Sequence, residues 1–131
     1  MSLIQTQMNG NTPVDIGSVL QCYLLPASIG LSTSLPASGS VVSQAIISGG
    51  LKNFSFGITS NETATISIQR YIDNLGTIPV GAAITGSLTA NTAGYVDSVD
   101  SVPYQSFIIT VSNSTSTAAT ISNCALLLQA N

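Results

Sequence analysis

The stretch that decides the fold runs from residue 53 to residue 73 and reads NFSFGITSNETATISIQRYID. Phe54, Phe56 and Ile58 alternate with small or polar residues, and after a polar interruption the alternation resumes at Ile66. Alternation with a period of two is typical of a strand with one buried face, and a short polar interruption marks a turn. The stretch therefore predicts two strands joined as a β-hairpin.

A second copy of this pattern lies near the end of the chain. Residues 104–112, YQSFIITVS, lead through a Ser/Thr-rich turn into a last strand at residues 117–128. Further strands are expected at residues 18–25, 41–48, 78–88 and 95–102, the last of them an edge strand that carries Asp97 and Asp100.

About eight strands with almost no helical periodicity, and with turn signals at short intervals, predict an all-β fold. We expect an antiparallel β-sandwich resembling a jelly roll, and the alternative is an immunoglobulin-like sandwich.

The strands follow an N-terminal segment of a different character. Residues 1–17 scatter apolar side chains among amides, and Pro13 favours extended backbone at Thr12. We therefore divide the chain into an extended N-terminal arm, residues 1–17, and a β-sandwich domain, residues 18–131. Within the domain, the segment from Pro26 to Ser40 is rich in Ser, Gly and Pro and predicts a long loop.

The composition excludes several classes of protein. Charged residues make up only 5% of the chain, against roughly 25% in ordinary domains. Lys52 and Arg70 are the only basic residues and face five carboxylates, which is too few cations for binding nucleic acid or an anionic membrane. No apolar run approaches the roughly 20 residues that span a bilayer, and the N-terminus lacks the features of a signal peptide. We expect a protein made in the cytoplasm of its producer, whose weakly charged surface is covered by partners; the alternative is a secreted, Ser/Thr-rich domain with a hydrated surface.

Three residues have alternative interpretations. Cys22 and Cys124 are either two buried thiols, which we expect, or a pair joined between terminal strands. Arg70 shares its strand face with buried isoleucines; we expect a bulge to turn it outward, and the alternative is a guanidinium that reaches a carboxylate at the rim of the sheet.

The sequence contains no recognisable catalytic, cofactor or metal site. Histidine is absent, so the commonest general base and the commonest metal ligand are missing. No serine lies in a GxSxG motif, and the glycine-rich phosphate-binding patterns are absent. We therefore predict no enzymatic activity and no cofactor.

The absence of histidine and of a signal peptide, the amide-rich start, and the segments ITSNETATISI and TVSNSTSTAATIS together resemble small virion proteins of tailed bacteriophages. The resemblance is strongest to capsid decoration or cement proteins. It implies a homo-oligomer, a dimer or trimer, located on the virion, where an arm clamps the major capsid protein or other virion proteins. The alternatives are a tail, head-fibre or receptor-binding module and a secreted adhesin-like surface domain.

On this interpretation the partner-binding side chains are apolar residues of the arm and of the long loop. They are Leu3, Ile4, Met8, Val14, Ile16, Ile29, Leu31 and Leu35.

Overall fold

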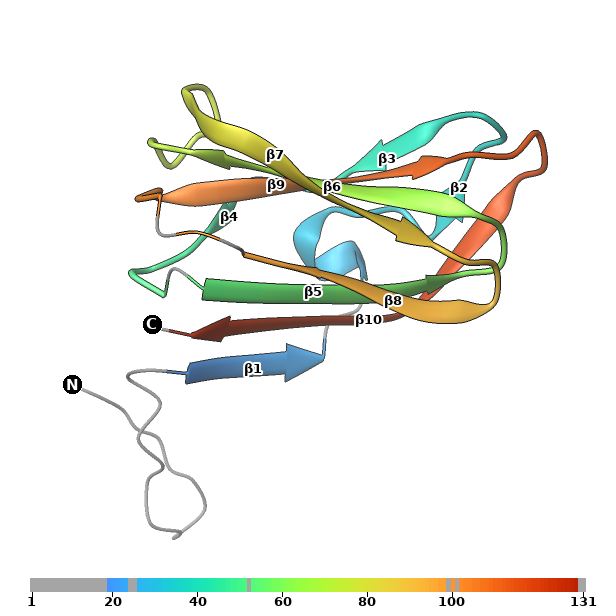
Figure 1. The fold of residues 1–131 in the computed structure, drawn as a ribbon, viewed down its shortest axis with the longest axis horizontal. Coiled ribbons are helices and arrows are strands. Elements are labelled where there is room, and N and C mark those ends of the chain that lie inside the picture. The colour runs from blue at the N-terminus through green and yellow to red at the C-terminus, as the bar shows by residue number, and fades with distance from the viewer. Residues whose placement is uncertain (1–18, 24–25, 52, 99, 101, 130–131) are drawn as a thin grey trace, which may run out of the picture.

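The computed structural model describes residues 19–23, 26–51, 53–98, 100 and 102–129 (Figure 1). Almost all of the described elements are strands, with one short 3₁₀ helix. In chain order they are β1 (Val19–Tyr23), the 3₁₀ helix η1 (Pro26–Ile29), β2 (Ser34–Leu35), β3 (Ser40–Val42), β4 (Ile46–Ile47), β5 (Asn53–Ser60), β6 (Ala64–Tyr71), β7 (Pro79–Leu88), β8 (Thr92–Asp97), β9 (Ser106–Asn113) and β10 (Ala119–Gln129).

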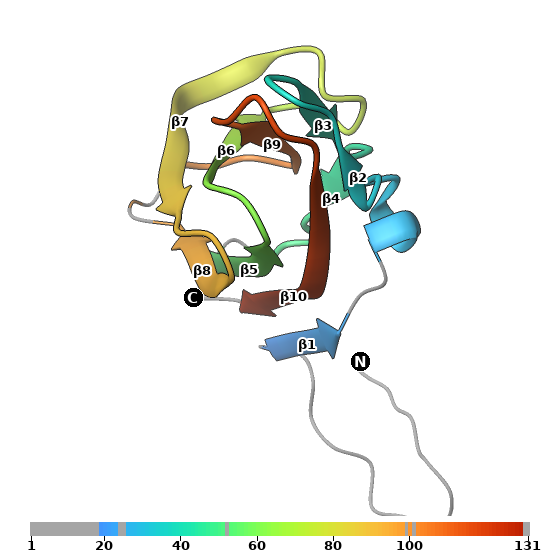
Figure 2. The ribbon, with the colours of Figure 1, turned by 90° about the vertical axis from the view of Figure 1, so that its right-hand side faces the viewer.

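The strands form two antiparallel sheets that pack face to face. The first sheet has the order β1-β10-β5-β8, with β2 added beside β10, and the second has the order β3-β9-β6-β7, with β4 added beside β9. Figure 2 looks along the sandwich and shows the second sheet above the first. The prediction of an all-β sandwich is confirmed.

The strand order is that of a jelly roll. The pairs β1·β10, β3·β9, β5·β8 and β6·β7 are all hydrogen-bonded and antiparallel, so the chain behaves as one long two-stranded ribbon. This ribbon wraps around the core and alternates between the two sheets, which adds the pairs β10·β5 and β6·β9. Successive wrapping of a paired ribbon distinguishes the jelly roll from the immunoglobulin-like alternative.

The two stretches predicted as hairpins are instead arches that cross between the sheets. β5 belongs to the first sheet and β6 to the second, and β9 and β10 are divided in the same way. The two arches lie side by side, because Asn61 and Thr120 exchange backbone and side-chain hydrogen bonds and the Ser114 amide donates to the Thr63 carbonyl. The alternation identified these strands correctly. It does not reveal whether the polar turn joins two strands of the same sheet or two strands that lie in different sheets.

The core lies between the inner faces of the sheets and has the predicted period of two. Along β5 the exposed fraction alternates so that Phe54, Phe56 and Ile58 are at most 2% exposed while their neighbours are half-buried. Phe54 stacks on Phe107 with ring centroids 4.9 Å apart, and Tyr104 packs edge-on against both rings. Cys124 is buried in the same core.

Two segments between β1 and β5 differ in detail from the prediction. The expected strand at residues 41–48 is divided into β3 and β4, because the intervening backbone leaves the ladder and Ser43 bonds Ile109 through both its main chain and its hydroxyl. The expected loop at residues 26–40 contains η1 and β2. The edge strand expected at residues 95–102 is only partly correct: β8 is an edge strand, but it begins at Thr92 and ends at Asp97, so Asp100 lies outside it.

Candidate functional site

The loop between β6 and β7 closes the ribbon and stands at one end of the sandwich. β6 and β7 are neighbours in sequence that also pair in one sheet, so the connection at residues 72–78 is a true hairpin loop. It lies at the upper left of Figure 1, where β6 passes into β7.

Asp73 holds this loop in one conformation. Its carboxylate accepts hydrogen bonds from the Thr77 amide at 3.0 Å, the Thr77 hydroxyl at 2.5 Å and the Ile78 amide at 2.9 Å. The Thr77 hydroxyl and the Ile78 amide stabilise the charged carboxylate and so lower the pKa of Asp73 from 3.8 to about 2. The loop is also tied to β9, because the Ser106 hydroxyl donates to the Asp73 carbonyl at 2.7 Å.

The loop lies against the second sheet at Gly76, where φ is +70°. A Cβ atom at this position would lie 2.8 Å from the Ile108 side chain and 3.5 Å from that of Ala45. Glycine is therefore required both by the left-handed backbone and by the close approach to β9. The residue beside it, Leu75, points to solvent and is 80% exposed.

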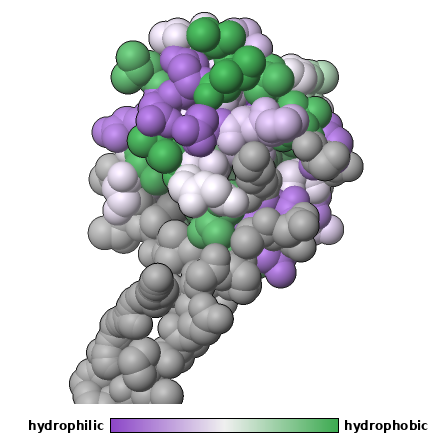
Figure 3. All heavy atoms as spheres, turned by 90° about the vertical axis from the view of Figure 1, so that its left-hand side faces the viewer, coloured by the Kyte–Doolittle hydropathy of each residue, from purple (hydrophilic) through white to green (hydrophobic). Residues whose placement is uncertain are grey.

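Four large aliphatic side chains are exposed around this loop, and we call them the end patch. They are Ile47, Ile72, Leu75 and Ile78, exposed by 55%, 53%, 80% and 53%. Ile47 belongs to the group because β4 pairs it with Ser106, which bonds the loop. Figure 3 views this end of the molecule and shows hydrophobic residues gathered toward its upper part. Exposed aliphatic side chains gathered on an ordered loop are typical of an interaction surface.

A depression of about 440 Å³ opens beside the end patch. Its lining is mostly apolar and consists of Ile72, Val80, Pro103, Tyr104 and Gln105. Tyr104 connects it to the aromatic core, and burial raises the pKa of Tyr104 to about 12. The depression extends the apolar surface of the end patch from the loop toward the interior of the sandwich.

Arg70 lies behind this depression and is 1% exposed. Its two terminal nitrogens bond both carboxylate oxygens of Asp100, at 2.5 and 3.2 Å, and its guanidinium carbon lies 5.8 Å from the centre of the Tyr104 ring. The hydrogen bond from Arg70 holds the pKa of Asp100 below its ordinary value of 3.8.

The expectation that a bulge would turn Arg70 outward is therefore wrong, and the rim ion pair that we gave as the alternative is present. The bulge is on β7, where Gly81 adopts φ +72° and a Cβ would lie 3.0 Å from the Arg70 side chain. The bulge thus makes room for the guanidinium inside the sandwich.

The outer face of the second sheet is different, because hydroxyl side chains line it. The register places Ser40, Ser112, Thr65 and Ser87 in one row across four strands. Ser40 and Ser112 share a hydrogen bond of 3.1 Å. This hydrated face contrasts with the end patch.

The predicted partner-binding residues fall into two groups. Leu3, Ile4, Met8, Val14 and Ile16 lie outside the described residues. The loop residues Ile29, Leu31 and Leu35 are 8%, 2% and 1% exposed and belong to the hydrophobic core.

The burial of these three side chains corrects their assignment as partner contacts. The three side chains fill the open side of the sandwich, where β2 pairs with β10. They therefore anchor the segment to the core and are not exposed to a partner. The sequence analysis did not identify the end patch. The signal for it was Asp73 at the start of a turn that lies between two isoleucines, Ile72 and Ile78.

Within the described part of the chain, no cluster of three or more His, Cys, Asp or Glu residues is arranged to hold a metal ion. The same residues include no helix with the length and apolar character needed to cross a membrane.

Comparisons with known proteins give distant structural neighbours and no family. No protein-family model matches the sequence, and no curated protein matches it. Tailspike protein 4 of bacteriophage CBA120, in its enzymatically active domain, is similar over 85% of this chain and 18% of its own, with 24% identity and a TM-score of 0.49.

Two other solved structures are similar at a TM-score of 0.45. The CBM22-1 and GH10 modules of the Clostridium thermocellum endo-1,4-beta-D-xylanase 10B, complexed with xylohexaose, match 79% of this chain and 21% of their own at 13% identity. PirA matches 92% of this chain and 100% of its own at 10% identity. The chain thus spans about a fifth of the tailspike and xylanase chains, and likenesses at this level carry no inference about function.

Proposed function

We propose that this protein is a non-enzymatic virion structural protein, of the capsid decoration or cement type, that binds the outer shell of the particle as an oligomer. The observation that carries the proposal is the end patch, in which four exposed aliphatic side chains stand around a loop that Asp73 holds in place. The resemblance of the sequence to small phage virion proteins is the reason for proposing a phage particle as the binding partner.

The end patch favours a protein as the partner. Large aliphatic side chains gain stability when a partner removes them from water, by about 1.5–3 kcal/mol for each fully buried side chain. A loop whose conformation is already fixed loses little conformational entropy on binding, so more of this gain remains as affinity.

Charge argues against nucleic acid as the partner. Of the two basic residues in the sequence, Arg70 is buried and engaged with Asp100, and Lys52 is the only other. Phosphate binding depends on several exposed cations, which this chain does not have. An outer position on the shell, away from packaged DNA, agrees with the net charge of -3.

The partner in this proposal is the major capsid protein or another virion protein, and the subunit is a dimer or trimer. The arm, residues 1–17, adds a second contact through its apolar residues. Two modest contacts on each copy, repeated over an oligomer, give a high overall avidity.

The proposal includes the absence of catalysis. Without histidine, none of the serines has the usual base to activate it, and two of the four described carboxylates, Asp73 and Asp100, are already engaged by Thr77 and Arg70.

The test is to purify particles of the virus that encodes the chain and to quantify this protein by mass spectrometry. A decoration protein is expected at a fixed, high ratio to the main shell protein, and purified protein added to particles from a gene-deleted virus should restore that ratio. Absence from particles, or a few copies per particle, would contradict the proposal.

A further inference from the structure

The outer face of the first sheet carries an exposed tyrosine beside a floor of small residues. Tyr95, on β8, is 71% exposed, and the register places it opposite Gly57 on β5, whose partner on the other side is Ala125 on β10. A depression of about 240 Å³ lies here, with Asn123 at its border. Gly57 keeps the floor low because it has no side chain; a Cβ at this position would lie 3.2 Å from the Gly94 carbonyl oxygen and 3.6 Å from the Cβ of Tyr95.

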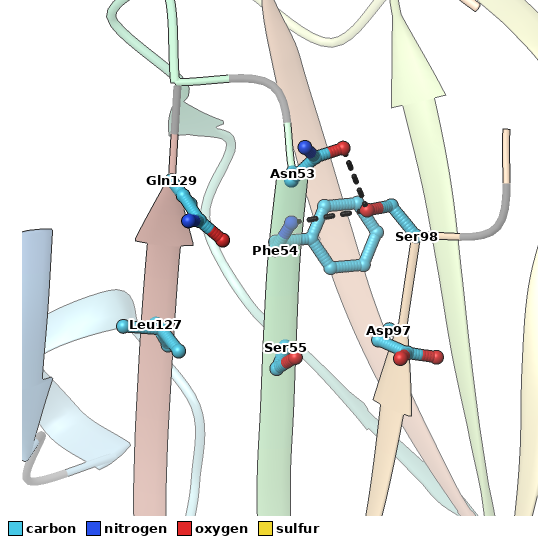
Figure 4. Close-up of a pocket in the computed structure, with 7 residues that line it drawn as sticks. All are labelled: Asn53, Phe54, Ser55, Asp97, Ser98, Leu127 and Gln129. Carbon is cyan, nitrogen blue, oxygen red and sulfur yellow. Dashed lines mark hydrogen bonds between the residues drawn. The ribbon is translucent and has the colours of Figure 1, made fainter. Parts of the chain in front are cut away.

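A second depression, of about 310 Å³, lies on the same face and is polar. Two residues further along the strands, Ser55 pairs with Asp97, and at the next step Asn53 pairs with Gln129 (Figure 4). Side chains of alternate residues on a strand are about 7 Å apart, so the two depressions are close neighbours. Together they form a shallow trough, which we call the Tyr95 trough.

The polar groups of the trough are available to a ligand. Ser98 donates to Asn53 Oδ1 at 3.5 Å and accepts a bond from the Phe54 amide, which leaves the Asn53 amino group as a donor. Among the described residues, none forms a hydrogen bond with the side chains of Asp97 or Gln129. The trough thus offers planar carboxylate and amide groups as both acceptors and donors.

We propose that the Tyr95 trough binds a neutral oligosaccharide. The apolar face of a pyranose ring packs on a tyrosine ring, while planar carboxylate and amide side chains bond pairs of neighbouring hydroxyls. Gly57 and Ala125 let the sugar lie close to the sheet, and the adjoining polar depression receives the next unit.

The charge of the trough selects against other ligands. Its described lining contains the carboxylate of Asp97, which repels phosphate, sulfate and acidic sugars. The shallow, open shape suits a chain laid across the sheet and does not suit an enclosed small molecule. This inference goes beyond the proposed structural role, since a saccharide site on an outer subunit would contact the surroundings of the particle.

The test uses the full chain on a printed array of neutral gluco-, xylo-, manno- and galacto-oligosaccharides of two to six units, with sialylated and sulfated glycans as the charged arm. Chemical shifts in a ¹⁵N-labelled sample then locate the site of any glycan that binds. We expect binding to at least one neutral glycan, with shifts at Gly57, Tyr95 and Asp97. No neutral glycan bound at millimolar concentration, binding of charged glycans only, or shifts confined to another face would overturn the proposal.

Two variants and a control complete the test. Tyr95→Ala and Asp97→Ala should each weaken binding at least tenfold, and both residues are exposed enough for the fold to persist, which circular dichroism checks. Leu75→Ser, in the end patch, should leave glycan binding unchanged. Unchanged binding by both trough variants would refute the site. Because none of these measurements involves particles, their failure would leave the particle-association test of the proposed function intact.

Discussion

Replacing Leu75 with serine should weaken attachment to particles without weakening the fold. Leu75 is 80% exposed, so the folded monomer gains little from it, whereas a partner that covers the end patch would bury most of it. Fully burying a leucine contributes about 1.5–3 kcal/mol, and four fifths of that is about 2 kcal/mol. Each bound subunit should therefore lose about 30-fold in affinity.

The assay is cosedimentation of purified protein with particles that lack it, over a range of protein concentrations. Leu75→Ser should shift the midpoint of binding about 30-fold to higher concentration, while its melting temperature stays within a few degrees of the wild type because the loop is held by Asp73 and not by the Leu75 side chain.

The matched control is Val42→Ser, which removes another exposed aliphatic side chain, 53% exposed, from the outer face of β3. Val42→Ser should bind particles normally. Equal affinities for Leu75→Ser and the wild type, or equal losses in both variants, would refute the role of the end patch.

Three further predictions concern stability. Asp100→Asn should lower the melting temperature, because Arg70 is 1% exposed and would keep a buried charge without its partner; adding Arg70→Met should recover much of the loss, and no recovery would contradict this account. As the pH falls from about 4 to about 2, the protection of the Ile78 amide against exchange, taken relative to its intrinsic exchange rate at each pH, should fall. The lowered pKa of Asp73 stabilises the loop above 3.8, and this stability is lost as the carboxylate is protonated; protection that stays constant over this range would exclude the carboxylate as the anchor. Ile68 is completely buried, so Ile68→Ala should lower the free energy of unfolding in urea by about 2–5 kcal/mol, and a loss below about 1 kcal/mol would mean that the core is packed differently.

The strands were predictable from sequence because burial on one face leaves a period of two. β5 and β6 follow the predicted alternation through Phe56 and Ile66. Their pairing was not predictable in the same way. In a hairpin the two strands would bond each other, whereas in an arch each strand bonds strands that are distant in the sequence, and the alternation is the same in both cases. Here β10 and β8 flank β5, and β9 and β7 flank β6.

The candidate site was harder to predict than the fold. Leu31 and Leu35 looked like surface anchors in a polar loop, yet the open side of the sandwich buries them. Arg70 looked too polar for the core, but a bulge at Gly81 and the carboxylate of Asp100 accommodate it. Both outcomes depend on contacts with residues distant in the sequence, which periodicity does not encode. Leu75 lies in the turn sequence between Asp73 and Thr77, and its exposure depends on the loop conformation that the Asp73 carboxylate fixes.

The proposal of a decoration protein is tested most directly by cryo-electron microscopy of particles from a gene-deleted virus, with and without added purified protein. The account predicts additional density at symmetry-related positions on the outer surface of the head, into which the jelly roll fits with the loop at residues 72–78 facing the shell. Additional density only at the tail, only inside the head, or with this loop facing away from the shell would contradict it.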